Sequence, residues 1–250
     1  MKINSREVTL LPVLGYCKLI NCDIIQPMSE GQSKWGQEFF DFAEPIRLKD
    51  PLAYILGSME EGELFVFKYP DAIKLAGHSC PAVSGAYKIT AKALSALYGS
   101  EIPVRGEIRA AVMGKATDLA YGPMSQVISL ITGAAPVTGF AGLGRRFRRR
   151  NLLVFDEDHF EYNTFIFQRS DTEKTVSITY NPDVVPEDPR LGELVSLVLT
   201  GQATEEEHRA FKKAWQEKVR MILLEDDKLP GLFDVREIPA GKFPQGNIKS

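Results

Sequence analysis

The chain has 250 residues, 44% of them hydrophobic, and a formal net charge of −3. This composition provides for a sizeable core in one or two domains, and the charge gives no overall attraction to nucleic acid or to an anionic membrane. Three cysteines are too few for a disulfide framework, no apolar run reaches the ~20 residues that span a bilayer, and the N-terminus lacks a signal sequence, so a cytoplasmic protein is expected.

Residues 1–68 are predicted to form an irregular α+β segment that packs on the core. Short strands are expected at residues 8–14 and 64–67, because both are apolar stretches with glycine and proline around them. Cys17 and Cys22 have no second cysteine pair to complete a metal site, which favours burial as small hydrophobic side chains.

Residues 76–87, Ala-Gly-His-Ser-Cys-Pro-Ala-Val-Ser-Gly-Ala-Tyr, place an imidazole and a thiol two residues apart at the start of a predicted helix. Pro81 suits the first helical position, apolar residues then recur at three- and four-residue spacing, and Gly99 ends the helix. The helix dipole at this N-terminus favours the thiolate form of Cys80. Such a pair is either two metal ligands or an activated nucleophile; the simpler alternative is a small buried cysteine beside a capping histidine.

The pattern after this helix predicts an α+β core over residues 69–181. Its further elements are a strand at 107–113, a helix at 123–132, and strands at 152–155, 164–168 and 175–180. Because two helices precede a run of strands, we expect a mixed or antiparallel sheet with helices packed on one face.

Residues 182–250 are predicted to be a linker and a helical C-terminal extension. Three prolines within residues 181–189 interrupt regular structure, and a short apolar helix is expected at 191–199. A longer helix begins after Thr204, where Glu207 completes a capping box.

This core resembles the E-subunit family of formylmethanofuran dehydrogenase over residues 70–170. That family carries a His-Gly-His-x-Cys-Pro-Gly motif at the start of a helix, followed by a tyrosine on its second turn. The matching residues here are Gly77, His78, Cys80, Pro81 and Tyr87, with later agreement at Thr132-Gly133 and Asn151-Leu152. The chain departs from the family pattern at Ala76, Ala82, Pro123 and Gln126.

The resemblance implies a zinc-binding α+β protein that forms a homodimer and serves a redox-enzyme partner in one-carbon or molybdenum/tungsten enzyme metabolism. Zinc accepts imidazole nitrogen and thiolate sulfur, so His78 and Cys80 are the predicted ligands, although these residues alone also admit nickel or ferrous iron. Further candidate site residues are Tyr87, Asp118 on the loop after strand 107–113, and His159. For His159 the alternative is a solvated acidic turn.

Residues 145–150 contain five arginines after a glycine-rich stretch. The glycine spacing fits neither a phosphate-binding loop nor a dinucleotide motif. Arg145, Arg146 and Arg148 are candidate ligands of an anion such as a phosphate or a polycarboxylate. The alternative is a solvated hairpin arm, or a face that pairs with acidic residues of a partner subunit. Nucleic acid is not expected, since the domain is not basic as a whole.

Three functions remain open at this point. The first is a metal-binding accessory protein. The second is an enzyme in which Cys80 is the nucleophile and His78 the base, or in which a metal-bound water attacks. The third is a metal-free module that binds a small ligand in a cleft beside Cys80, lined by Tyr87 and Arg109.

Overall fold

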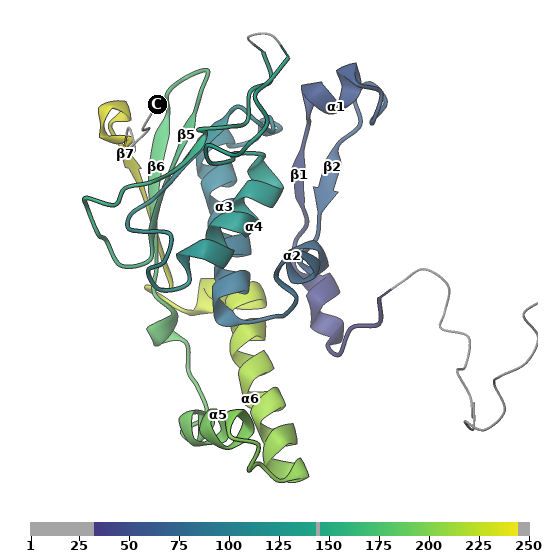
Figure 1. Ribbon diagram of the computed structural model, residues 1–250, viewed down its shortest axis with the longest axis vertical. Helices are drawn as coiled ribbons and strands as arrows, with labels where there is room; N and C mark the ends of the chain where they lie inside the picture. Colours follow the sequence, from purple (N-terminus) through teal and green to yellow (C-terminus); the bar gives the residue numbers. More distant parts are fainter. Residues whose placement is uncertain (1–32, 144–145, 245–250) are drawn as a thin grey trace, which may run out of the picture. The chain divides into compact units, whose positions relative to one another are not determined.

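The computed structural model describes residues 33–143 and 146–244 (Figure 1). The chain divides into two units, and nearly all described residues belong to the larger one, Gln37–Ser250. The predicted segment boundaries at residues 68 and 181 both lie inside the larger unit.

The described residues form six α-helices and seven strands. The helices are α1 (Pro51–Ile55), α2 (Tyr69–Ala76), α3 (Pro81–Tyr98), α4 (Tyr121–Thr132), α5 (Leu191–Leu199) and α6 (Glu205–Leu224). The strands are β1 (Ile46–Leu48), β2 (Phe65–Phe67), β3 (Ile108–Val112), β4 (Leu153–Phe155), β5 (Thr164–Arg169), β6 (Thr175–Tyr180) and β7 (Phe233–Ile238). Among these residues, we find no helix with the length and apolar character that crossing a membrane requires.

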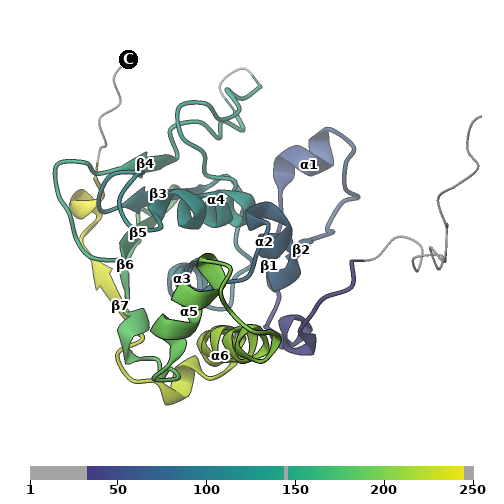
Figure 2. The same cartoon turned by 60° about the horizontal axis from the view of Figure 1, so that its bottom comes forward.

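Five strands form the main sheet in the order β4-β3-β5-β6-β7. Strands β3 and β4 are parallel and connected through α4, whereas the other neighbouring strands are antiparallel. The helices lie on one side of this sheet (Figure 2). The predicted α+β class, with a mixed sheet and helices on one face, is therefore confirmed.

The helix-facing side of the sheet follows the alternation that the sequence predicts. Val176, Ile178 and Tyr180 of β6 are buried on this side, where α3 packs. Gly85 lets α3 approach β6 closely, because a Cβ atom at this position would overlap the ring of Tyr180.

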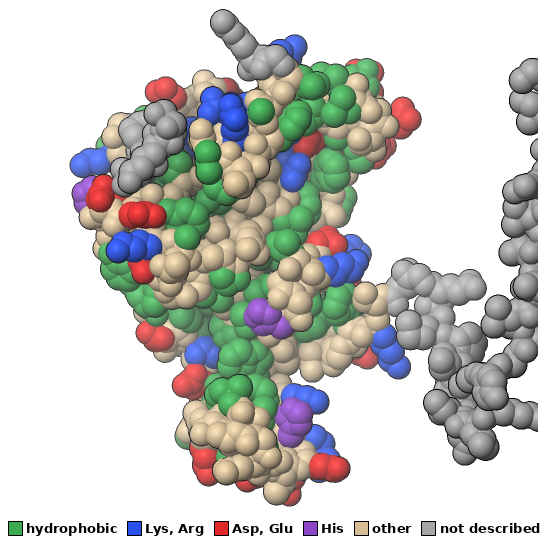
Figure 3. Space-filling view, in the orientation of Figure 1, with side chains coloured by type: hydrophobic (Ala, Val, Ile, Leu, Met, Phe, Trp, Pro, Cys, Tyr) green, Lys and Arg blue, Asp and Glu red, His purple; other side chains and the backbone are tan. Residues whose placement is uncertain are grey.

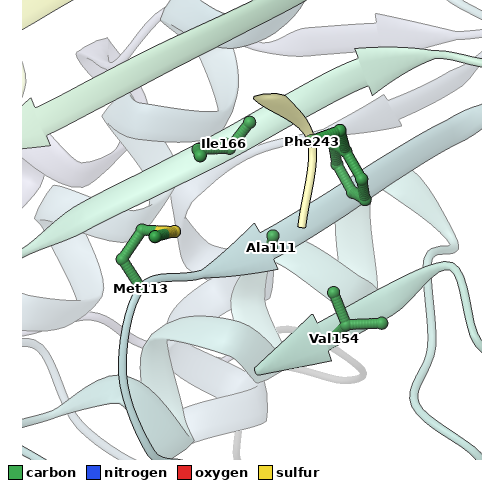
Figure 4. Close-up of a cluster of buried hydrophobic side chains, with 5 residues drawn as sticks. All are labelled: Ala111, Met113, Val154, Ile166 and Phe243. Atoms are coloured by element: carbon green, nitrogen blue, oxygen red, sulfur yellow. The ribbon is translucent and has the colours of Figure 1, made fainter. Parts of the chain in front are cut away.

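The opposite side of the sheet carries a smaller apolar cluster, shown in Figure 4. Its buried members are Ala111, Met113, Val154, Ile166 and Phe243. Phe243 comes from the C-terminal segment and covers residues that would otherwise expose an apolar sheet face to water.

The C-terminal segment contains the two predicted helices and one further strand. Helices α5 and α6 form as expected, but Phe233–Ile238 becomes β7, which pairs antiparallel with β6 at the edge of the core sheet. Residues 233–236 do alternate between apolar and polar types, but this signal covers only four positions between flanking glycines and prolines.

A small second sheet, β1 with β2, precedes the core. The strand predicted at 64–67 is confirmed as β2, but its partner β1 and helix α2 were not predicted from the sequence. Strands of three residues are too short to show a periodic pattern. The predicted strand at 8–14 lies outside the described residues, as do Cys17 and Cys22.

Candidate functional site

Two consecutive helices position the predicted His-x-Cys pair. Helix α2 ends at Ala76, and Gly77 follows it in the left-handed conformation with φ +75°, which glycine adopts without strain. Helix α3 begins at Pro81, as the sequence predicts, and Cys80 is its N-cap residue. Residues 77–80 thus form a tight connection between α2 and α3, called here the His78 loop.

Cys80 is nearly buried, with 9% of its surface exposed, and its sulfur accepts a hydrogen bond from Val83 N at 3.5 Å. Burial raises the pKa of the Cys80 thiol, and the backbone N–H groups of Val83 and Ala82 offset this only in part. The prediction that the helix dipole favours a thiolate is therefore wrong. Desolvation of the sulfur opposes ionisation and has a larger influence on this pKa than the backbone hydrogen bonds at the start of the helix.

His78 is exposed, in contrast to Cys80. Its Nδ1 lies 2.9 Å from the carbonyl oxygen of Ala76. Because a carbonyl only accepts hydrogen bonds, Nδ1 must carry a proton, which leaves the lone pair on Nε2 for another partner. A hydrogen bond from one ring nitrogen to the backbone is the arrangement that orients many metal-binding histidines.

Helices and strands distant in sequence hold the His78 loop in place. Two α6 side chains, Trp215 and Gln216, donate to the carbonyl oxygen of Ser79 at 3.0 and 3.3 Å. The hydroxyl groups of Tyr69 and Ser79 lie 2.8 Å apart, and Tyr180 donates to the carbonyl of Pro81 at 2.9 Å. The sequence places Trp215 on a buried helical stripe, but it contains no signal that this stripe meets the His78 loop.

Tyr87 and Asp118, two further predicted site residues, form hydrogen bonds with backbone groups away from the His78 loop. Tyr87 is buried about two turns into α3, and its hydroxyl donates to the backbone oxygens of Glu44 and Phe67 at 2.8 and 2.9 Å. Asp118 accepts a hydrogen bond from Lys115 N at 2.9 Å and closes a turn.

His159 lies in the acidic turn, and Nδ1 of its exposed ring lies 3.1 Å from a carboxylate oxygen of Asp156. Within the described residues, none of Tyr87, Asp118 and His159 forms a hydrogen bond or ion pair with His78 or Cys80. The structure therefore does not bring these candidates together with the His-x-Cys pair.

The His78 loop has the donor types that zinc prefers but does not complete a zinc site by itself. Within residues 33–143 and 146–244, no three His, Cys, Asp or Glu side chains gather as a group that could hold a metal ion. A structural zinc site usually needs four ligands. The described part of this chain does not supply the remaining ligands.

The proposed cleft between Tyr87 and Arg109 is not formed. Arg109 projects to the side of the sheet opposite α3, where its guanidinium lies 4.0 Å from the ring centroid of Phe243 and donates to Gln168 at 2.8 Å. Tyr87, by contrast, is buried in α3. Because successive residues of β3 point to opposite faces of the sheet, the Arg109 side chain lies on the face away from α3 and therefore away from Tyr87.

The arginine run divides into buried and exposed side chains. Arg149 is buried and forms an ion pair with Asp50 at 2.6 Å. Arg146 and Arg148 are exposed. Arg145, the third predicted anion ligand, lies outside the described residues.

Comparison with known proteins identifies one family. A family model described as "FmdE, Molybdenum formylmethanofuran dehydrogenase operon" matches residues 75–229, more than half of the chain. The match begins just before the His78 loop and continues through α6, beyond the 70–170 region that carries the sequence resemblance. Among curated proteins, none matches this chain.

Proposed function

Because the chain belongs to the FmdE family, named for the molybdenum formylmethanofuran dehydrogenase operon, we propose that it is a non-catalytic accessory protein whose His78 loop binds zinc. The observation that carries this proposal is the His78–Cys80 pair, an exposed imidazole with a proton on Nδ1 and a thiol two residues away. When bound, zinc would crosslink the connection between α2 and α3. The accessory role, beside a redox enzyme of one-carbon or molybdenum/tungsten metabolism, is part of the proposal.

The remaining zinc ligands need a source outside this loop. A second copy of the chain, water, or residues outside the described part of the chain could each supply them, and the proposal includes a homodimer as the first source to test. Because zinc binds the thiolate, metal binding must displace the proton from Cys80, and metal affinity should fall as the pH is lowered.

An enzyme with Cys80 as nucleophile fits the geometry less well. The raised pKa of Cys80 keeps it as a thiol, and its sulfur accepts its hydrogen bond from a backbone N–H group rather than approaching a base. The Nδ1 of His78 is engaged with Ala76. A nucleophile normally lies within hydrogen-bond reach of its base.

A metal-free binding module is the second candidate function. The burial of Cys80 favours it, because a capping thiol that is held neutral by desolvation needs no metal to explain it. Under this hypothesis the His78 loop is a structural connection, and the ligand of the protein binds elsewhere.

Metal content of the full-length, tag-free protein decides between these functions. We expect zinc by mass spectrometry, at about one ion per chain, or about one per two chains where two His78 loops share one ion, and loss of that zinc in both His78→Ala and Cys80→Ser. His159→Ala is the matched control, because His159 is also an exposed histidine, but its Nδ1 is hydrogen-bonded to the carboxylate of Asp156. Absence of zinc from the wild-type protein after growth with added zinc, or equal loss in the control, would contradict zinc binding at the His78 loop.

The mass of the protein in solution tests the source of the remaining ligands. If a second copy supplies them, light scattering should report a dimer that dissociates when zinc is chelated and in the His78→Ala variant. A zinc-loaded monomer would exclude the second copy and point to ligands within one chain or from water.

A further inference from the structure

A small cavity lies beside the arginine run, near the C-terminal end of α4 and apart from the His78 loop. Its volume is about 190 Å³, and its lining includes Arg105, Glu107, Arg146, Phe147, Arg148 and Arg149. At about 30 Å³ per water, this space holds about six water molecules, which suits a small ion or one charged group of a larger ligand. Figure 3 shows lysine and arginine side chains on the upper part of the surface, where this run lies.

Two of the four arginines are already committed to the fold. Arg105 and Arg149 bind the two carboxylate oxygens of Asp50, at 3.0 and 2.6 Å. Arg105 also donates to the carbonyl oxygens of Leu130 and Ile131 at the end of α4. One buried carboxylate thus holds two guanidinium groups, so these side chains form a rigid, positively charged wall of the cavity.

The other two arginines have no carboxylate partner in the described part of the chain. The guanidinium of Arg146 lies 4.9 Å from the ring centroid of Phe147, and Arg148 donates through Nε to the carbonyl of Arg150 at 3.1 Å. The sequence contains no Asp or Glu between Asp118 and Asp156. The charges of Arg146 and Arg148 are therefore not neutralised by neighbouring residues of their own loop.

Three consecutive residues, Arg146, Phe147 and Arg148, line the same cavity. Phe147 has φ +58°, a left-handed conformation that is rare for an aromatic residue. In an extended strand, Arg146 and Arg148 would share one face and Phe147 would lie on the other. Here all three line the cavity.

We propose that this cavity binds a phosphoryl dianion, either inorganic phosphate or the phosphate of a monoester. Four arginines line the cavity, Glu107 is the acidic residue of the lining, and Asp50 pairs with Arg105 and Arg149, so the formal charges leave an excess of two positive charges. A phosphate monoester carries a charge of about −1.5 to −2 at neutral pH. Arginine forks match phosphate oxygens in geometry, and Arg146 and Arg148 are the predicted contacts.

Isothermal titration calorimetry on the full-length protein at low ionic strength tests this site, with inorganic phosphate and phenyl phosphate as probes. We expect saturable binding of both. Arg146→Gln and Arg148→Gln should each weaken it by about tenfold or more, as for a lost hydrogen bond to a charged group. Arg150→Gln is the matched control, because Arg150 is exposed in the same run but does not line the cavity. Unchanged circular dichroism and melting temperature would establish that the variants fold.

Four outcomes would overturn the proposal. The first is that neither probe binds saturably, and the second is that chloride at matched ionic strength gives the same binding heat as the probes. The third is that Arg150→Gln weakens phosphate binding as much as Arg146→Gln or Arg148→Gln does. The fourth is that malonate binds more tightly than either phosphate probe. The last would assign the cavity to dicarboxylates instead. Tighter binding of phenyl phosphate than of inorganic phosphate would identify a monoester as the source of the phosphoryl group.

Discussion

At the scale of single residues, burial controls the chemistry of the His78 loop. Cys80 and His78 are two positions apart, yet the thiol is nearly buried and the imidazole is exposed. Cys80 therefore resists ionisation, whereas His78 presents an available nitrogen at the surface. This difference disfavours a nucleophile–base pair, in which the thiol and the imidazole must approach each other.

The reactivity of Cys80 checks this assignment. We expect iodoacetamide to modify Cys80 at neutral pH more slowly than free cysteine, because the raised pKa lowers the thiolate fraction and burial limits access. The rate should increase as the pH rises above the ordinary range of a thiol. Mass spectrometry of a Cys17→Ser/Cys22→Ser chain isolates this residue, and modification faster than that of free cysteine would restore the nucleophile hypothesis.

At the scale of elements, α3 connects the site to the sheet. The helix begins at the His78 loop, packs on β6 through Gly85, and Tyr180 of β6 returns a hydrogen bond to Pro81 in its first turn. Helix α6 covers the same loop through Trp215. Helix α6 therefore belongs to the architecture around the His78 loop, and the family match continues through it.

Gly85→Ala tests this close packing. Alanine favours a helix by about 1 kcal/mol over glycine, but overlap with the Tyr180 ring is expected to cost about 1–3 kcal/mol. We expect a net loss of about 1 kcal/mol in the free energy of unfolding, measured by urea denaturation.

Gly192→Ala in α5 is the matched control for Gly85→Ala. No heavy atom lies within 4 Å of the position that its Cβ would occupy, so this change should be neutral or slightly stabilising. A stabilised Gly85→Ala protein would show that α3 and β6 do not pack as closely as described.

At the scale of the whole molecule, the core contains many buried phenols. The five are Tyr69, Tyr87, Tyr98, Tyr121 and Tyr180. Burial raises the pKa of each, and that of Tyr98 reaches about 12. These groups stay neutral in the folded protein at pH values where the unfolded chain ionises them.

The buried tyrosines predict alkaline instability. An unfolded tyrosine ionises near pH 10 (about its reference value), so above this pH the unfolded chain binds fewer protons than the folded protein and stability falls as the pH rises. Each such group lowers the free energy of unfolding by up to about 1.4 kcal/mol per pH unit above about pH 10, and below that pH it adds no pH dependence.

Circular dichroism and tyrosinate absorbance should therefore change together above this pH. Tyr98→Phe removes one titrating group and should lower by about one the number of protons that unfolding releases at alkaline pH. Ionisation of the buried tyrosines without unfolding would contradict the raised pKa values.

The sequence by itself determined the parts of this protein that depend on neighbouring residues. Pro81 and Gly99 delimit α3 as predicted, Gly133 ends α4, and Thr204 with Glu207 caps α6. Caps, helix periodicity and strand alternation all act over a few positions, so the pattern of residues displays them. The family motif at the start of α3 is equally local, which explains why the family and the α+β class could be predicted.

Only the tertiary structure decided which distant residues meet. Asp50 and Arg149 form their ion pair across 99 positions, Trp215 reaches Ser79 across 136, and β7 completes the sheet at the edge of β6. Such contacts arise from packing and leave no periodic trace in the sequence. Burial, which follows from the same packing, opposes the predicted ionisation of Cys80. Ion pairing with Asp50 distinguishes Arg105 and Arg149 from Arg146 and Arg148, which line the same cavity without a carboxylate partner in the described residues.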